Sequence, residues 1–420
     1  MELPPTTLIK AVKGTRDLLP PSTDVWNAVE AEARSVLRAY NYREIRTPIL
    51  EETQLFARGV GAETDIVTKE MYTFDDRDGS SLTLRPENTA SVIRAYIEHR
   101  MDQWPGVKKL FYIGPMFRRE RPQKGRYRQF YQIGAEAIGS ESPAVDAEVI
   151  EMVVEILERV GLSGFQLLIN SVGDHNCRPQ FVERLRQELK AVAGRMCGDC
   201  QRRAETNPLR VLDCKVEADQ PIIEKLPNIV EHLCEPCRTH FDAVKQYLDD
   251  RGIPYQVRPR LVRGLDYYMR TTFEVVHGAL GAQNSVLGGG RYDGLAESLG
   301  SKIASPGIGF SIGEDRLVMS VEENRPPTPL DLYIASLGEP ALRKAAVMAR
   351  DFRRGGLAVE IGEGKLKRAM ELADKLGARF TLMVGDNEIA AGRYALKNMS
   401  TGEQRDVAIE EIPGSVAAGN

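Results

Sequence analysis

The chain has 420 residues, of which 42% are hydrophobic and 28% charged, and its formal net charge is -4 at pH 7. At about 150 residues per domain, this length predicts two or three domains with cores of their own. No stretch approaches the ~20 apolar residues that a membrane span needs, and residues 1–14 lack a basic region followed by an apolar run. We therefore expect a cytoplasmic protein without a membrane partner.

An amphipathic helix is predicted over residues 22–40, where apolar side chains recur at helical spacing. A short extended run follows over residues 42–47 and leads to Pro48. By itself, this periodicity fits an ordinary helix on the core of a domain.

A strand, a turn and a helix start are predicted over residues 82–90, which read LTLRPENTA. Pro86 marks the turn, and the helix should begin near Asn88 or Thr89. The carboxylate of Glu87 at such a turn can capture an amine. An acid near a helix start is also commonly stabilising through the helix dipole, so both readings stay open.

A basic loop between two predicted antiparallel strands dominates residues 111–136. From Arg118 to Arg128 there are six cations and one acid, Glu120. The loop exceeds the usual hairpin length, and its proline and glycine argue against a hidden helix. Arginine suits phosphate, because its guanidinium group donates two parallel hydrogen bonds. Charge alone leaves a phosphate-binding loop and a solvated hairpin tip as the alternatives.

A helix over residues 144–160 and a strand over residues 165–170 are predicted next. Charged helical segments then fill residues 177–251. Six cysteines in the chain are too few for a disulfide scaffold, and a cytoplasmic protein keeps them reduced.

Four of these cysteines form two C-x-x-C pairs that are separated by 33 residues. That separation exceeds the ~15–20 residues of a compact zinc ribbon, although helices can fill the gap. The spacing favours reduced thiols and leaves one structural zinc site as the alternative. Its ligands would be Cys197, Cys200, Cys234 and Cys237.

The fold is expected to resume with residues 255–261; the segment VRGLDYYMR follows and leads to a predicted strand over residues 271–276. Arg263 precedes Gly264, where a side chain can project into a cleft; the alternative is a turn with a surface arginine. The glycine-rich segments 287–295 and 307–317 follow, and the second of them contains Arg316.

A proline-rich linker over residues 326–330 precedes a segment in which predicted strands and helices alternate. That order predicts a small α/β domain over residues 331–420 with a mainly parallel or mixed sheet. This domain contains 13 Lys plus Arg and 13 Asp plus Glu, so its net charge does not indicate RNA binding.

The order and spacing of these segments resemble the histidyl-tRNA synthetases of bacterial type, in subclass IIa of the class II aminoacyl-tRNA synthetases. Phe117 to Glu120 with the basic loop resembles motif 2, and RPENTA resembles a loop that is commonly RPEGT in that family. RGLDYY resembles the family's histidine-specific segment, and residues 307–317 resemble its motif 3. Asn88 replaces the family's glycine, and Gly-Glu-Asp-Arg replaces the frequent Gly-Leu-Glu-Arg before the motif 3 arginine.

The resemblance implies a role for each matched residue. The catalytic residues would be Arg118 and Arg263. ATP would be bound by Arg118, Glu120 and Arg316. Histidine would be bound by Glu87, Thr89, Gln132, Glu136, Arg263, Tyr267, Tyr268 and Tyr292. The acceptor end of the tRNA would meet Gln123, Lys124, Arg126 and Arg128.

The resemblance also implies a fold and an activity. The fold would be an α+β catalytic domain on an antiparallel sheet over residues 1–325, with a helical insertion at 177–251 and a C-terminal α/β anticodon-binding domain. The activity would be ATP-dependent activation of L-histidine, with Mg²⁺, and its transfer to tRNA(His) by a homodimer. The alternative is a non-catalytic synthetase paralogue that acts as the regulatory subunit of ATP phosphoribosyltransferase. Such paralogues lose parts of the motifs, which this chain retains.

Overall fold

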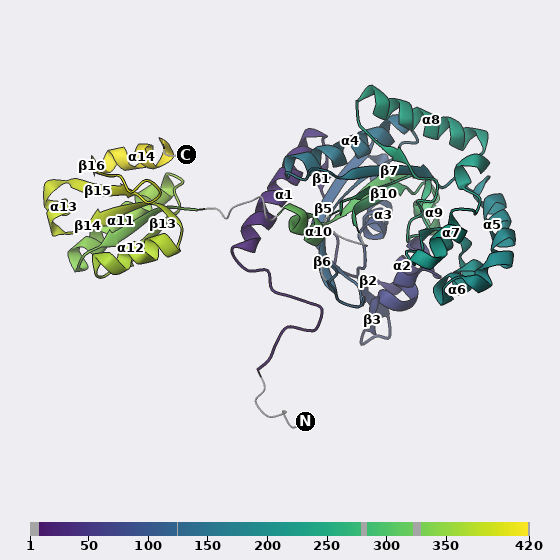
Figure 1. The fold of residues 1–420 in the computed structure, drawn as a ribbon, viewed down its shortest axis with the longest axis horizontal. Coiled ribbons are helices and arrows are strands. Elements are labelled where there is room, and N and C mark those ends of the chain that lie inside the picture. The colour runs from purple at the N-terminus through teal and green to yellow at the C-terminus, as the bar shows by residue number, and fades with distance from the viewer. Residues whose placement is uncertain (1–7, 124, 279–283, 322–328, 419–420) are drawn as a thin grey trace. The chain divides into compact units, whose positions relative to one another are not determined.

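The computed structural model describes residues 8–123, 125–278, 284–321 and 329–418 (Figure 1). The chain divides into two compact units, residues 1–326 and residues 327–420. No helix in these described ranges is both long enough and apolar enough to cross a membrane.

An eight-stranded sheet forms the centre of the first unit. Its strands lie in the order β1-β5-β6-β11-β10-β9-β7-β8. The six inner strands, from β5 to β7 in this order, run antiparallel to one another. The two short edge strands run parallel to their neighbours. The bounds are β1 Arg43–Glu44, β5 Lys108–Phe117, β6 Gln129–Ile138, β7 Gln166–Ser171, β8 Gln256–Val257, β9 Met269–Val276, β10 Ser285–Arg291 and β11 Gly307–Gly313. The predicted antiparallel sheet is confirmed, although the extended run expected at 42–47 contains only the two-residue strand β1.

The two faces of this sheet differ because successive side chains of a strand point to opposite sides. On one face, apolar residues such as Ile133, Phe273 and Phe310 form a core with the helices. Four helices contribute buried residues to that core: α1 Ser22–Ala39, α4 Pro143–Arg159, α8 Glu235–Asp250 and α10 Glu314–Val321. The helix predicted at 22–40 is therefore confirmed, and Val29 and Val36 of its apolar side are fully buried.

The opposite face is covered by a small sheet and short helices. A three-stranded sheet has the order β2-β4-β3. Its bounds are β2 Leu50–Glu52, β3 Tyr72–Asp75 and β4 Ser81–Leu84. The adjoining helical elements are α2 Thr53–Gly59, a π-helical turn Ile66–Glu70, α3 Thr89–Glu98, a 3-10 turn Met101–Gln103 and α9 Leu295–Ser298. Helix α3 begins at Thr89, as predicted from the turn at Pro86.

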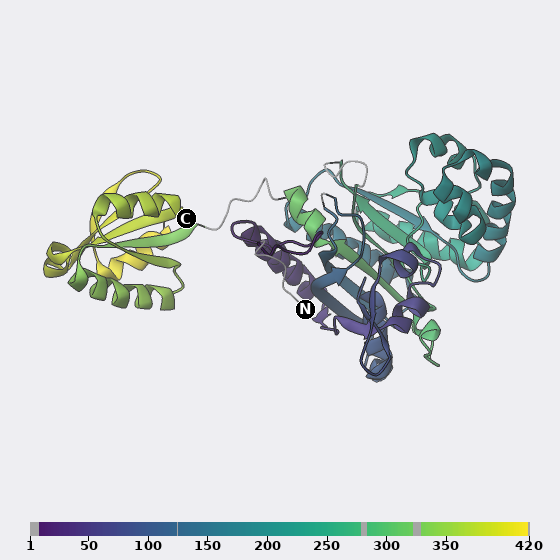
Figure 2. The ribbon, with the colours of Figure 1, turned by 90° about the horizontal axis from the view of Figure 1, so that it is seen from below.

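The predicted insertion, residues 177–251, is helical. Figure 2 shows most of its teal helices gathered at one end of the first unit. They are α5 Arg178–Val192, α6 Gly198–Thr206, α7 Gln220–Ile223 and α8, with 3-10 turns Ala193–Arg195, Pro208–Asp213, Glu217–Asp219 and Ile229–His232. Helix α8 differs from the others, because its Phe241, Val244 and Leu248 belong to the core against the large sheet. The boundaries of a separate insertion domain stay a prediction.

The second unit is a mixed five-stranded sheet in the order β13-β12-β14-β15-β16, with a parallel half and an antiparallel half. Its strands are β12 Leu330–Ser336, β13 Val359–Glu363, β14 Ala378–Val384, β15 Arg393–Asn398 and β16 Gln404–Ala408. Its helices are α11 Glu339–Arg354, α12 Leu366–Lys375, α13 Asp386–Ala391 and α14 Ile412–Ala418, with a 3-10 turn Ile409–Glu411. The predicted α/β alternation is confirmed. Residues 326–328 of the predicted linker lie outside the described residues, and Leu330 already belongs to β12.

Candidate active site

The candidate site occupies the face of the large sheet opposite the helix core. Strand register places Glu136 of β6 beside Gly309 of β11. Gly309 pairs with Gly290 of β10, and Gly290 pairs on its other side with Thr272 of β9. Because residues two apart in a strand share a face, Gln132 points to the same side as Glu136. Sequence segments that are far apart in the chain thus contribute to one surface.

Glycines on β10 and β11 make room for the side chains of this surface. A Cβ atom at Gly309 would overlap the Glu136 carboxylate, and one at Gly307 would overlap the Tyr292 ring. A Cβ atom at Gly288 would overlap the guanidinium group of Arg263. The glycine-rich segments therefore let large polar side chains lie flat against the strands.

A buried carboxylate lies at the centre of the site. Glu136 is completely buried, and its Oε1 accepts a hydrogen bond from the Thr89 hydroxyl at 2.7 Å. Burial raises the pKa of Glu136 to about 8, since desolvation disfavours the charged form. The hydroxyls of Tyr112 and Tyr292 approach this carboxylate closely enough to lower its pKa in part, without meeting hydrogen-bond geometry. The side chain is thus poised to change charge near neutral pH.

Glu87 is the second buried carboxylate of the site. Its two oxygens accept hydrogen bonds from the backbone N–H groups of Thr89 and Ala90, at 2.8 and 2.9 Å, at the start of α3. The hydroxyl of Tyr267 donates to the same carboxylate at 3.5 Å. Burial raises the pKa of Glu87, and the two backbone donors oppose that rise. Both predicted readings of Glu87, helix-start stabiliser and site carboxylate, are therefore compatible with its position.

Aromatic rings lie beside these buried carboxylates. The rings of Tyr267 and Tyr268 lie 4.8 Å apart, and the ring of Tyr292 meets that of Tyr267 edge-on at 6.0 Å. Several buried polar atoms here have no hydrogen-bond partner among the described residues. They are Gln132 Oε1, Glu136 Oε2, Tyr112 OH, Tyr292 OH and Arg263 Nε. Since buried polar groups are normally satisfied, these atoms indicate a pocket for a polar ligand.

Three arginines surround the pocket. Arg118 donates to the carbonyl of Pro86 at 2.8 Å, and its guanidinium group lies 5.3 Å from the centre of the Phe130 ring. Arg263 forms an ion pair with Glu274 at 2.9 Å. Arg316 donates to the carbonyl of Ser285 at 2.7 Å. Burial lowers the pKa of Arg316, and the nearby positive charges of Arg126 and Arg118 lower it further, opposed by Glu120 and Glu274. Cations held this close together favour binding of a polyanion.

The basic loop folds back on itself at its tip. Gln123 and Arg126 pair as a short antiparallel bridge, and Arg126 forms an ion pair with Glu120 at 2.8 Å. Arg128 instead holds the N-terminal segment, because it donates to the carbonyl of Lys13 at 3.1 Å. Lys124 lies outside the described residues.

Sequence reasoning missed several residues that build the site. Tyr112 lies directly opposite Gly134 and reaches the Glu136 carboxylate; the alternation of β5 could have indicated it. Arg85 donates to the carbonyls of Pro115 and Thr47, both at 3.0 Å, and so ties the loop before α3 to its neighbours. Asn88, the departure from the family pattern, has an ordinary φ of -118°.

The single zinc site that the sequence left as the alternative to reduced thiols would combine both C-x-x-C pairs. The structure separates the two C-x-x-C pairs, because each pair begins a different helix and finds its own additional cysteine and aspartate. The first cysteine cluster consists of Asp174, Cys177, Cys234 and Cys237. The second cysteine cluster consists of Cys197, Cys200, Cys214 and Asp219.

Comparison with known proteins places the chain in a family. It matches the family model described as Histidyl-tRNA synthetase over residues 14–317, and the model described as Anticodon binding domain over residues 331–418. It is 80% identical to the histidine-tRNA ligase of Solibacter usitatus, covering 98% of this chain and 99% of the relative. The corresponding ligase of Koribacter versatilis is 59% identical, with 96% of this chain and 95% of the relative covered. The crystal structure of apo S. aureus histidyl-tRNA synthetase has a TM-score of 0.80 at 40% identity, covering 97% of this chain and 100% of that one. The chain therefore belongs to the histidyl-tRNA synthetase family.

Proposed function

We propose that this chain activates L-histidine with ATP, forming histidyl-adenylate and pyrophosphate, and then transfers the histidyl group to the 3′ end of tRNA(His). Family membership supports an aminoacyl-tRNA synthetase with this specificity. The observation that carries the proposal is the pocket around the buried Glu136 carboxylate, with arginines that favour an anion beside it.

Histidine binds in the tyrosine-lined pocket. Thr89 and Glu87 receive its α-amino group at the start of α3, where the carboxylate is already held in place by backbone donors. Glu136 accepts a hydrogen bond from one imidazole nitrogen, and the unpartnered oxygen of Gln132 is available to another donor of the ligand. Tyr267, Tyr268 and Tyr292 line the pocket.

Activation brings two anions together. A carboxylate oxygen of histidine attacks the α-phosphorus of ATP, a P–O bond forms, and the bond to pyrophosphate breaks. Arg118 and Arg263 stabilise the charge at the α-phosphate from two sides, which is a positioning and electrostatic role. Arginine stays protonated at any working pH, so neither residue moves a proton. Arg316 and Glu120 hold the remainder of the nucleotide.

Transfer to tRNA follows at the same site. A ribose hydroxyl of the terminal nucleotide attacks the carbonyl carbon, and AMP leaves. Gln123 and Arg126 face the acceptor end, with Lys124 between them in the sequence, and phosphate contacts there position the RNA. Arg128 contributes to this surface by donating a hydrogen bond to the carbonyl of Lys13, which fixes the N-terminal segment beside the loop. The second unit binds the anticodon, in line with the family model that it matches.

Two further parts of the proposal concern magnesium and assembly. Mg²⁺ enters with ATP, since phosphate and carboxylate oxygens are its natural ligands. The chain forms a homodimer through α1 and the segment before Pro48. Ile49 and Leu50, next to that segment, are 41% and 46% exposed, which supports an apolar contact there. Light scattering coupled to size-exclusion chromatography tests the assembly.

The deciding experiment is ATP–pyrophosphate exchange with each of the twenty amino acids, followed by charging of tRNA(His). We expect exchange with histidine alone and histidine-dependent charging. Exchange with another amino acid would contradict the specificity. Folded protein without any exchange would favour the regulatory paralogue and leave the retained arginines without a function.

A further inference from the structure

The two cysteine clusters account for all six cysteines of the chain, three in each. In each cluster, one ligand atom from each of four residues lies within 4.8 Å of the other three. In each cluster one carboxylate accompanies the three thiols, and each of the four residues has at least one partner that belongs to a different turn or helix. This convergence is not a consequence of C-x-x-C spacing, because Cys177 and Cys214 come from outside the pairs.

The separations within the clusters match a tetrahedral ion. With zinc–sulfur bonds of about 2.3 Å and zinc–oxygen bonds of about 2.0 Å, a tetrahedron separates two sulfurs by about 3.8 Å and a sulfur from an oxygen by about 3.5 Å. In the second cluster, Cys197 Sγ lies 3.9 Å from Cys214 Sγ, which lies 3.3 Å from an oxygen of Asp219.

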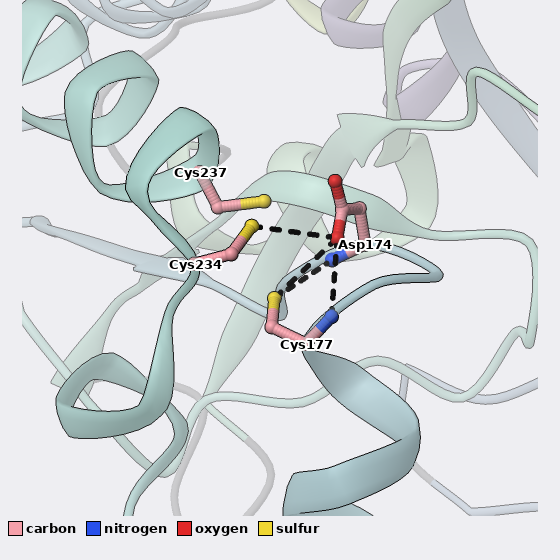
Figure 3. A group of neighbouring side chains, drawn as sticks. All are labelled: Asp174, Cys177, Cys234 and Cys237. Atoms are coloured by element: carbon pink, nitrogen blue, oxygen red, sulfur yellow. Dashed lines mark hydrogen bonds between the residues drawn. The ribbon is translucent and has the colours of Figure 1, made fainter.

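The first cluster has the same dimensions (Figure 3). An Asp174 oxygen lies 3.5 Å from Cys177 Sγ and 3.7 Å from Cys234 Sγ. Figure 3 shows the sulfur of Cys237 pointing into the same space. The donor atoms thus surround one point rather than forming a row.

The positions of several sulfurs resemble those of metal ligands. Cys177, Cys197 and Cys234 are the residues immediately before helices α5, α6 and α8, where the positive end of the helix dipole stabilises a negative sulfur. Backbone N–H groups of Asp174 and Val216 each donate to a cluster sulfur at 3.4 Å. Such outer contacts orient metal ligands.

Disulfide bonds fit the clusters less well. Each cluster holds an odd number of thiols, so pairing would leave one cysteine over beside a carboxylate. The 3.9 Å between the Cys197 and Cys214 sulfurs is also far longer than the ~2.05 Å of a disulfide. Zinc uses all four ligands of each cluster at once.

We propose that this chain holds two structural zinc ions, one in each cysteine cluster. Each site has four protein ligands and no open position, which is the arrangement of a structural rather than a catalytic zinc. The first ion joins the end of β7 and the start of α5 to α8, and so closes the base of the helical segment. The second ion joins α6 to the segment that ends at Asp219.

The second site also affects the candidate active site. The segment between its ligands contains Asn207, which donates to Asp266 of the RGLDYY segment at 3.2 Å. Arg203 of α6 forms an ion pair with Asp65 at 3.0 Å. Zinc in the second cluster therefore fixes the helical segment against the loop that carries Tyr267 and Tyr268.

The test is the metal content of the full-length, untagged chain, prepared under reducing conditions without chelator and measured by mass spectrometry. We expect two zinc ions per chain. Cys237→Ser should lose the first ion and keep the second, and Cys200→Ser should do the reverse. The measurement needs no enzymatic activity, so it stands independently of the proposed function.

Aspartate variants provide matched controls. Asp219→Ala should release its zinc to a chromogenic chelator faster than wild type, whereas Asp199→Ala should not, because Asp199 is exposed and outside the cluster. Asp174→Ala and the exposed Asp242→Ala form the corresponding pair for the first cluster. Equal release rates within a pair would remove that aspartate from the ligand set.

Wild-type protein keeps the proposal falsifiable if the serine variants fail to fold. Co²⁺ added to metal-depleted protein should give the visible absorption of tetrahedral thiolate complexes, with two ions bound per chain. Folded protein that contains no zinc and binds neither Zn²⁺ nor Co²⁺ would overturn the proposal, and a thiol count would then separate reduced cysteines from disulfides. One ion per chain would overturn it for the cluster whose cysteine variant changes nothing.

Discussion

The hydroxyl of Thr89 donates to the carboxylate of Glu136 at 2.7 Å, across 47 residues of sequence. This hydrogen bond joins the start of α3 to the middle of β6, so the proposed amino-group and imidazole ends of the pocket share one network. A change in the charge of Glu136 therefore affects both ends.

Replacing Glu136 by Gln should weaken histidine binding. A hydrogen bond to a charged group contributes about 1.5–3 kcal/mol, so we expect KM for histidine to rise by about 10- to 150-fold in pyrophosphate exchange. Glu141→Gln is the matched control, because Glu141 is exposed. An unchanged KM in the Glu136 variant would contradict the proposed contact with imidazole.

The pH dependence of histidine binding should follow Glu136. Burial raises the pKa of Glu136 to about 8 in the empty pocket, so the carboxyl group is protonated below that pH and ionised above it. Because the ionised form is the better acceptor for an imidazole N–H, KM for histidine should fall as pH rises from 7 to about 9. Wild type and Glu136→Gln measured in parallel separate this effect from the titration of histidine itself. Identical pH profiles would exclude Glu136 as the titrating group.

Replacing Gly309 by Ala should damage the pocket, because the added methyl group would overlap the Glu136 carboxylate. Overpacking of this kind costs about 1–3 kcal/mol of stability. We expect kcat/KM for histidine to fall by the factor that corresponds to a similar free energy. Gly313→Ala on the same strand is the control, since its nearest contact would be an ordinary 3.7 Å. Equal effects of the two substitutions would show that the strand tolerates no side chain in general.

Replacing Arg263 by Ala should lower histidine-dependent pyrophosphate exchange by about 10²–10³-fold, the usual effect of losing one group that stabilises developing charge. The exposed Arg258 provides an Arg→Ala control nearby in the sequence. Circular dichroism and the unfolding midpoint should match wild type for both variants. Near-normal exchange in a well-folded Arg263 variant would refute its assigned role.

Asp146 should be a major determinant of stability. Its fully buried carboxylate pairs with Arg291 at 2.8 Å and contacts His240 at 2.8 Å. Asp146→Asn removes the fully buried one of the two carboxylates that pair with Arg291 and leaves Asp293 at 2.6 Å, so the loss should be part of the about 3–5 kcal/mol that a buried charge without any partner costs. Urea unfolding measures this difference, and the exposed Asp242→Asn should stay within about 0.5 kcal/mol of wild type. An effect within about 0.5 kcal/mol would mean that Asp293 alone supplies a sufficient counter-charge for Arg291.

Much of the fold could be predicted from local patterns. The helix at 22–40 has a clear 3.6-residue period, and the strands on either side of the basic loop have flanking turn residues; both are confirmed. In the second unit, β15 and β16 were missed. Both are short, β16 begins with three polar residues, and the pairing of the two strands with each other and with β14 supplies what their own sequence does not.

The candidate site, like the fold, could be predicted from the sequence only in part. The resemblance of short motifs to those of the family singled out the arginines, tyrosines and carboxylates, and their roles stay predictions. The sequence could not indicate the contacts of Arg85, which lie on other strands and loops, and for Tyr112 it offered only the alternation of β5. It could not indicate the raised pKa of Glu136 either, because that shift comes from burial beneath distant segments.

The sequence by itself determined the family motifs, the helical periodicity and the presence of two C-x-x-C pairs, all of which are local properties of the chain. Only the tertiary structure decided that Cys177 joins Cys234 and Cys237 while Cys214 joins Cys197 and Cys200. The physical reason is that residues separated by dozens of positions meet only when helices pack, and packing depends on the summed burial of many side chains rather than on any one spacing.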